Sequence, residues 1–193
     1  MEAHEATELI EHGHGHENNK TAFIISFFAM VLAIAALGGA NATKEATKEN
    51  ILASNAHNFY QAKVSRQQAL SIASTNLEIK LAEQPTMSTA SKELILQKLE
   101  EYKKNIQRYE SDPENKEGKK ELLLIAKEHE MERDHAIHQD PWFDCAESIL
   151  QIAIVILSVS ILGSIPALVY VGSLLGIVGL LSTINGFLLI FHF

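Results

Sequence analysis

The sequence predicts an all-α membrane protein, in which three transmembrane helices carry a cytoplasmic, coiled-coil-like helical domain. Three strongly apolar runs are each long enough to cross a bilayer as a helix, and the only charged residue in them is Glu147, near the start of the second run. The chain is 47% hydrophobic and 21% charged, yet nearly all its charged residues lie in residues 1–20 and 43–144. Such segregation is typical of membrane spans joined to a polar domain.

These observations divide the chain into five segments. Residues 1–20 are an acidic, His-rich flexible tail, 21–42 are the first transmembrane helix and 43–144 are a soluble helical domain. Residues 145–164 and 167–191 are the second and third transmembrane helices. The first run, "TAFIISFFAMVLAIAALGGANA", has no polar face of the kind a soluble core helix shows. Its "ANA" also fits signal-peptide cleavage, but acidic residues precede the run and favour a retained span.

The last two runs are separated only by Ile165 and Pro166, which predicts a helical hairpin. In the third span Gly172, Gly176 and Gly179 form a small-residue face that is expected to pack closely against another helix. Asn185, in the same span, is expected to hydrogen-bond a neighbouring helix.

The stretch "DPWFD" at 140–144 is interpreted as the start of the second span. Asp140 is the expected N-cap and Pro141 the first helical residue. Trp142 and Phe143 are then expected at the depth of the lipid headgroups, as membrane-interface anchors.

Positive charges predict the orientation. Lys44 and Lys48 follow the first span, Lys127 and Arg133 precede the second, and the opposite side offers Lys20 alone. Because cytoplasmic flanks are rich in Lys and Arg, the middle domain and the C-terminus are expected in the cytoplasm of a bacterium, with the spans in its inner membrane.

The middle segment reads as helix, broken at Pro85 and at Asp112–Pro113, and its first helix is expected to continue the first span without interruption. Its apolar residues recur at helical steps and predict a narrow packing seam. The predicted seam comprises Leu52, Ala56, Phe59, Ala62, Ala69, Ala73, Leu77 and Leu81.

Composition and motifs exclude several classes of function. The net charge of −8 argues against nucleic acid as a partner. Phosphate-binding loops, dinucleotide fingerprints and nucleophile elbows are absent from the sequence, so we expect a protein that is not an enzyme, with no catalytic residue and no cofactor.

Two histidine-containing stretches raise the question of a metal. In "EHGHGHE", His12, His14 and His16 are candidate ligands for a divalent metal ion. Glu132 and His135 have a spacing found in di-iron bundles, but such sites need the pair twice, so a solvated helix face is favoured.

The stretches "NFYQAKVSRQQ" at 58–68 and "DPWFDCAESILQIAIVILSVSIL" at 140–162 resemble an uncharacterised bacterial membrane-protein family, catalogued as a domain of unknown function. The resemblance implies one N-terminal span, a helical middle and a closing pair of spans, and it adds no catalytic residue.

We therefore expect a non-enzymatic scaffold or accessory subunit, in contact with membrane lipids. It would form a homo-oligomer or join a larger membrane complex through exposed helix faces. Two alternatives stay open: a metal-handling membrane protein that uses the N-terminal histidines, and an oligomeric pore or transporter.

Overall fold

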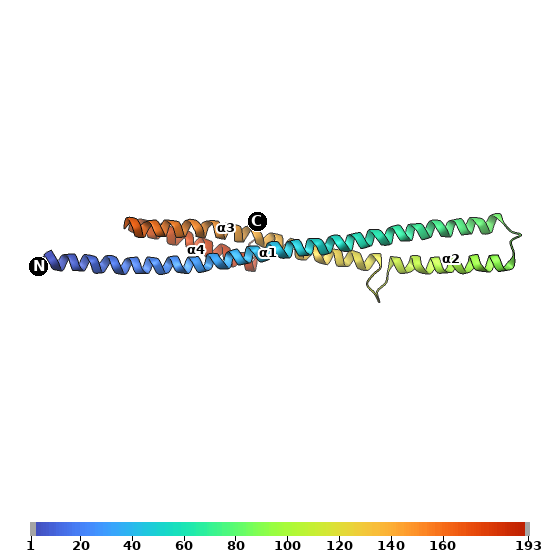
Figure 1. Ribbon diagram of the computed structural model, residues 1–193, viewed down its shortest axis with the longest axis horizontal. Helices are drawn as coiled ribbons and strands as arrows, with labels where there is room; N and C mark the ends of the chain where they lie inside the picture. The colour runs from blue at the N-terminus through green and yellow to red at the C-terminus, as the bar shows by residue number, and fades with distance from the viewer. Residues whose placement is uncertain (1–2, 192–193) are drawn as a thin grey trace. The chain divides into compact units, whose positions relative to one another are not determined.

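The computed structural model describes the backbone of residues 3–191 and the side chains of residues 19–191. Four helices follow one another: α1 (Ala3–Glu83), α2 (Thr89–Glu110), α3 (Lys119–Gly163) and α4 (Pro166–Leu188) (Figure 1). Three of them, α1 from Asn19 onward, α3 and α4, are long and apolar enough to cross a membrane. The predicted class, an all-α protein with three candidate spans, is confirmed.

The helices form two compact units. Unit 1 comprises Met1–Ala46 and Asp134–Phe193, and unit 2 comprises Thr47–Arg133. Helices α1 and α3 each contribute to both units, so no loop separates the units. Unit 2 is shorter at both ends than the predicted soluble segment. Within unit 1, for example, the Thr43 hydroxyl donates a 2.9 Å hydrogen bond to the Asp140 carboxylate.

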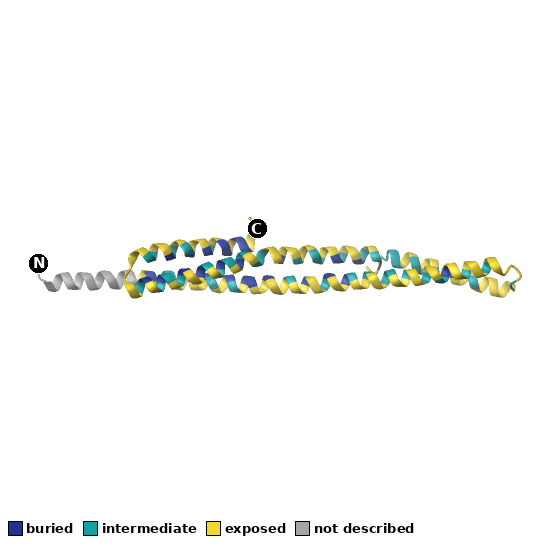
Figure 2. Cartoon of the chain, turned by 90° about the horizontal axis from the view of Figure 1, so that it is seen from above, coloured by how far each residue is buried: buried dark blue, intermediate teal, exposed yellow. Residues whose placement is uncertain are grey.

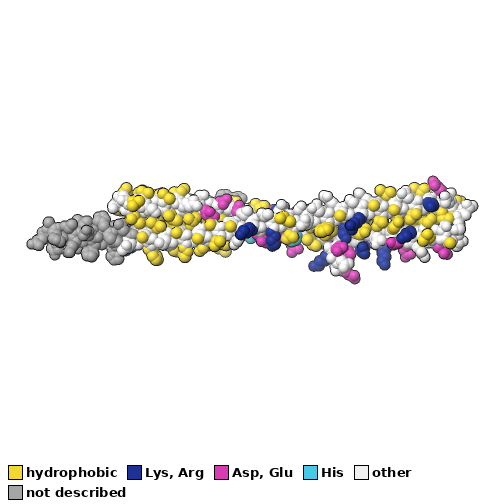
Figure 3. All heavy atoms as spheres, viewed as in Figure 1, with side chains coloured by type: hydrophobic (Ala, Val, Ile, Leu, Met, Phe, Trp, Pro, Cys, Tyr) yellow, Lys and Arg dark blue, Asp and Glu magenta, His cyan; other side chains and the backbone are white. Residues whose placement is uncertain are grey.

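Unit 1 is a three-helix bundle with a small, dense core. Phe28, Val31 and Ala35 of α1 pack with Leu150 and Leu157 of α3, and Figure 2 shows dark blue buried positions along these helices. The outward side chains are also large and apolar: Figure 3 shows hydrophobic side chains over most of the visible surface of unit 1. A bundle that is apolar both inside and outside suits lipid rather than water.

The α3–α4 turn has the hydrogen bonds of a Schellman motif. The Ile165 amide donates to the Ser160 carbonyl at 3.1 Å, and the Ser164 amide donates to the Ile161 carbonyl. Ser164 takes the left-handed conformation that glycine usually fills, with φ of 50°. Pro166 then begins α4. The predicted helical hairpin is thus closed by a short, hydrogen-bonded turn.

The predicted helix start at Asp140 is wrong. Pro141 lies inside α3, which runs without a break from Lys119 to Gly163. A proline in a helix removes one backbone hydrogen bond and crowds the carbonyl four residues earlier. Here helical segments on both sides of Pro141 are held by packing, which outweighs that local cost.

In unit 2 the inward face of α1 lies one residue away from much of the predicted seam. Phe59, Ala62 and Ala69 are exposed. The inward positions instead repeat at steps of three and four and are buried or half-buried: Ala53, Ala56, Tyr60, Lys63, Gln67, Leu70, Ser74, Leu77 and Leu81. Ala56, Leu77 and Leu81 belong to both the predicted seam and the inward face. The polar residues Lys63, Gln67 and Ser74 also lie on the inward face, and a count of apolar residues could not identify them.

The predicted breaks lie where the helices of unit 2 end. Helix α1 stops at Glu83, two residues before Pro85, and the Ser88 side chain caps α2 by accepting a hydrogen bond from the Ser91 amide at 3.3 Å. Asp112 and Pro113 lie in the turn between α2 and α3. Helix α3 begins only at Lys119.

Candidate functional site

The glycines of α4 are the points where the helices of unit 1 approach most closely. A Cβ atom on Gly172 would lie 2.7 Å from Leu157 Cγ, and one on Gly179 would lie 2.6 Å from Leu150 Cγ. Gly176 faces the ring of Phe28 on α1, again with no room for a methyl group. Small residues of this kind let helix backbones come close enough for extensive van der Waals contact.

The contacts between α3 and α4 follow a seven-residue register. Gly172, Gly179 and Gly186 of α4 lie opposite three large side chains of α3, which recur seven residues apart in the reverse direction: Leu157, Leu150 and Phe143. Gly172 and Gly179 were predicted from the sequence as packing residues, whereas Gly186 was not. All three predicted packing glycines therefore contact helices of the same chain, so this face needs no second copy to cover it.

Phe143 fills the space at which α1, α3 and α4 meet. It is 1% exposed, and a Cβ atom on Gly38 or Gly186 would clash with its ring. The Phe187 ring lies edge-on to it, with centroids 4.9 Å apart. Phe143 is thus a core residue whose ring does not face the lipid headgroups. Trp142 is half-buried, and its anchoring role stays a prediction.

Asn185 closes the C-terminal end of α4 instead of joining two helices. Its side-chain amide donates to the Phe191 carbonyl at 3.0 Å and accepts from the Phe191 amide at 2.9 Å. The backbone turns here through Leu189, which is left-handed with φ of 47°. Asn185 is 7% exposed, and these two bonds satisfy polar groups at a helix end.

In unit 2, polar side chains connect α1 to α3. Glu49 Oε2 lies 2.5 Å from His129 Nδ1, and Lys48 Nζ donates to Glu49 Oε1 at 3.0 Å. Two turns further along α1, His57 Nε2 lies 2.9 Å from Glu130 Oε1. The hydrogen bond from Lys48, followed by that from His129, holds the pKa of Glu49 below its ordinary value.

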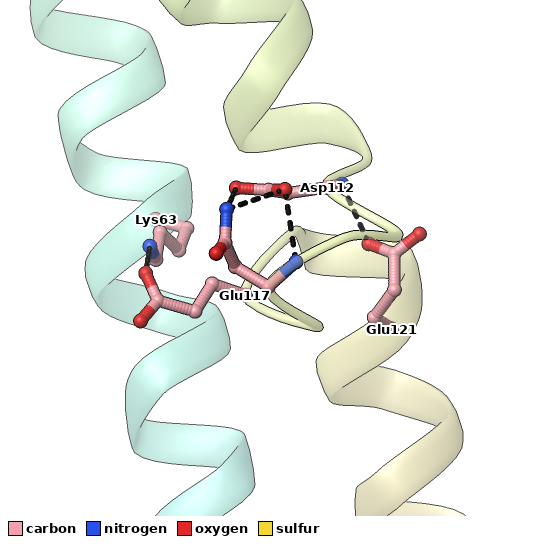
Figure 4. A network of polar contacts seen from close by, with 5 residues as sticks. Lys63, Asp112, Glu117 and Glu121 are labelled. Atoms are coloured by element: carbon pink, nitrogen blue, oxygen red, sulfur yellow. Dashed lines mark hydrogen bonds and ion pairs between the residues drawn. The ribbon is translucent and has the colours of Figure 1, made fainter.

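The turn between α2 and α3 is held by a second polar network (Figure 4). Glu121 accepts from the Ser111 hydroxyl at 2.6 Å and from the Asp112 amide at 3.0 Å, and both bonds lower its pKa. Gly118 is buried where a Cβ atom would lie 2.6 Å from Ser111 Cα. Lys63 of α1 donates to Glu117 at 3.0 Å and so ties the turn to α1.

The same network extends along α2. The Gln67 amide donates to the Ile106 carbonyl and to Glu110, both at 3.2 Å. Lys119 forms an ion pair with Glu110 at 2.6 Å, and Lys63 Nζ lies 5.5 Å from the Tyr109 ring centroid. Every member of this cluster bonds another helix or the turn, so the arrangement is suited to fixing the three helices together.

Metal ligation was a sequence expectation for the N-terminal tail. His12, His14 and His16 lie outside the residues whose side chains the structure describes. Across residues 19–191, no three His, Cys, Asp or Glu side chains gather as a metal site would require. Among the neighbours of Glu132 and His135 in the sequence, His129 and Glu130 are engaged with α1.

Comparison with known proteins identifies the family of this chain. The model of a protein family described as "Domain of unknown function (DUF4337)" matches residues 17–189, which is almost the whole chain. No curated protein matches the chain. No solved structure matches it.

Proposed function

The chain belongs to the DUF4337 family, and we propose that it is a non-enzymatic scaffold or accessory subunit of the bacterial inner membrane. It self-associates or docks onto a larger membrane complex through its helices. Unit 2 and the C-terminus lie in the cytoplasm, as Lys44, Lys48, Lys127 and Arg133 favour.

The observation that carries this proposal is the apolar surface of unit 2. Although unit 2 contains most of the charged residues, large apolar side chains stay exposed on all three of its helices. They are Ile51, Phe59, Ile72, Ile79, Leu94, Leu96, Leu123, Leu124 and Met131. Exposed apolar side chains in this number on a narrow helical unit favour a protein partner, because water is a poor solvent for them.

The surface of unit 1 supports a different neighbour. Phe23, Leu162 and Tyr170 are 75%, 87% and 78% exposed, and lipid chains would cover them at no cost. The glycine contacts satisfy the close packing that three spans need among themselves. Unit 1 is then an anchor, and association is assigned to unit 2.

The test is the mass of the protein after extraction in a mild detergent, with identification of every protein that travels with it. We expect a particle of two or more chains, or a stoichiometric complex with another membrane protein. A single chain without any co-purifying protein would contradict the proposal.

A catalytic role can be tested separately, by replacing a polar side chain of unit 2 that the assembly does not need. Replacing His57, which pairs with Glu130 in unit 2, by Gln should leave the extracted mass and any associated proteins unchanged. A loss of a cellular function without a loss of assembly would point to chemistry instead.

A further inference from the structure

Pro141 lies in the interior of α3, and its side chain is exposed. Because proline has no N–H, the carbonyl of Ile137, four residues earlier, loses its helical hydrogen bond. Proline also disfavours the helical conformation of the residue before it, which here is Asp140. An exposed side chain contributes little packing to offset these two costs, so Pro141 weakens α3 locally.

Helix α1 has a weak point of its own beside Pro141. Gly38 and Gly39 are adjacent and buried, and a Cβ atom on Gly39 would lie 3.3 Å from the Cβ atom of Phe143. The two glycines make room for Phe143, and they also give this turn of α1 two residues of low helix propensity. Helix α4 ends two residues after Gly186, which lies against the same Phe143 ring. Helices bend sharply at prolines and at glycine pairs, and in unit 1 one of each faces the other.

Thr43 connects the two weak points. Its hydroxyl lies 2.9 Å from Oδ1 of Asp140, the residue whose helical conformation Pro141 disfavours. The same hydroxyl lies 3.0 Å from the carbonyl oxygen of Gly39, four residues earlier in α1. A hydroxyl has a single hydrogen to donate. Because the two distances are nearly equal, rotation of the hydroxyl alone moves that hydrogen from one acceptor to the other.

The two hydrogen bonds have opposite effects on the helices. A bond from Thr43 to Asp140 ties α1 to α3 and holds Asp140 in the helix. A bond from a threonine to the carbonyl four residues earlier bends the helix that contains it, and here that carbonyl belongs to Gly39. The choice of acceptor therefore selects between a straight and a bent pair of helices.

We propose that Thr43 is the latch of a two-state joint in unit 1. When the hydroxyl donates to Asp140, α1 and α3 stay straight. When it donates to the Gly39 carbonyl, Asp140 is released, and the two helices bend together, α1 at Gly38–Gly39 and α3 at Pro141. This inference concerns the conformation of a single chain and goes beyond the proposed function, since it requires no partner.

The first experiment measures hydrogen–deuterium exchange of the full-length protein in a mild detergent, in the α1 peptide that covers residues 36–46. Asp140→Ala removes the acceptor in α3 and leaves the sequence of this peptide unchanged. It should speed exchange in the peptide about fivefold, the factor that corresponds to one ordinary hydrogen bond. Asp144→Ala, at an exposed position one turn further along α3, is the matched control and should leave exchange unchanged. Equal exchange in Asp140→Ala and the wild type would overturn the proposal.

The second experiment stiffens the joint from the side of α3. Pro141→Ala restores a backbone N–H and removes the restriction on Asp140, so α3 should resist bending. If the two helices bend together, exchange in the α1 peptide should slow about fivefold, because one backbone hydrogen bond is regained. Unchanged or faster exchange in α1 would show that the bends are not shared and would overturn the joint. This variant removes a helix breaker, so it tests the proposal even if Asp140→Ala lowers the helix content measured by circular dichroism.

The third experiment tests the latch itself. Thr43→Ser keeps the hydroxyl and should exchange like the wild type once the rates are corrected for sequence. Thr43→Val keeps the shape of the side chain and removes both hydrogen bonds. It should speed exchange less than Asp140→Ala does, because the bent state loses its bond to the Gly39 carbonyl as well. An effect of Thr43→Val as large as that of Asp140→Ala would overturn the two-acceptor latch.

These outcomes are independent of the test of the proposed function. A single chain without any co-purifying protein would contradict the scaffold proposal and leave the joint in place. Exchange in the α1 peptide that responds to none of the α3 substitutions would overturn the joint and leave the scaffold proposal in place.

Discussion

Unit 1 and unit 2 hold helices together in opposite ways. The largest fully buried side chains, Phe143, Leu150 and Leu157, all belong to unit 1, where each lies against a glycine of α4. In unit 2 the buried apolar residues are mostly alanines and leucines, and polar contacts such as Glu49–His129 connect the helices. In lipid, burial of apolar surface drives nothing, so association depends on close packing. In water a thin apolar face is supplemented by polar contacts.

This contrast predicts that the stability of unit 1 depends most on the volume of its buried side chains. Phe143→Ala would leave a cavity among three helices, and we expect it to destabilise unit 1 by about 3 kcal/mol or more. Phe23→Ala, at a position that is 75% exposed, should cost far less. Thermal unfolding in detergent, followed by circular dichroism, measures both. Equal losses would show that Phe143 is not part of the core.

The next largest loss of stability should come from adding side-chain volume at a glycine of α4. Gly176→Leu places a side chain where the Phe28 ring lies, and overpacking of this kind costs about 1–3 kcal/mol. Val178→Leu, on an exposed position of the same helix, is the control and should be tolerated. If Gly176→Leu unfolds at the wild-type temperature, α4 does not pack on α1 as described.

The stability of unit 2, in contrast, should depend on pH. Because the pKa of Glu49 is depressed in the folded state, its contribution is present above the ordinary carboxylate pKa and is lost as the pH falls through the folded-state pKa. Wild-type unit 2 should therefore lose stability in acid, and Glu49→Gln should lose less on acidification. Glu100→Gln, on the outward face of α2, should retain the wild-type pH dependence. The measurement is the stability of the protein as a function of pH. If Glu49→Gln shows the same pH dependence as the wild type, Glu49 does not have the stabilising role described here.

The smallest effect is expected at the α3–α4 turn. Ser164 takes a left-handed conformation, which costs a residue with a Cβ atom about 1 kcal/mol relative to glycine. Ser164→Gly should therefore stabilise unit 1 by roughly that amount or less, because glycine also gains freedom in the unfolded chain. Ser158→Gly, within α3, should destabilise it. Destabilisation by Ser164→Gly would argue against the Schellman turn.

The sequence was sufficient for the features that depend on local composition. The three apolar runs, the hairpin at Ile165–Pro166 and the helix end before Pro85 all follow from hydropathy and backbone restriction. The continuity of α1 followed from the lack of a helix breaker after residue 42.

The predictions that were wrong concern the direction in which side chains point and the residues that they contact. Phe143 was placed at the lipid surface because aromatic rings are common there, but Gly38 and Gly186 on two other helices leave a space that its ring fills. The signal was a seven-residue row of glycines opposite a seven-residue row of large side chains, visible only once α3 and α4 are paired. Pro141 was given a cap role that the continuous α3 does not need.

The proposed topology places unit 1 in the bilayer and unit 2 in the cytoplasm. Its most direct test is labelling with a membrane-impermeant maleimide in a Cys145→Ala background, which removes the only cysteine, with a single cysteine at Gln97 or at Ser164. Because α3 would cross the membrane once between α2 and the Ser164 turn, the account predicts that position 97 is labelled only in inside-out vesicles and position 164 only in right-side-out vesicles. Labelling of both positions from the same face would contradict it.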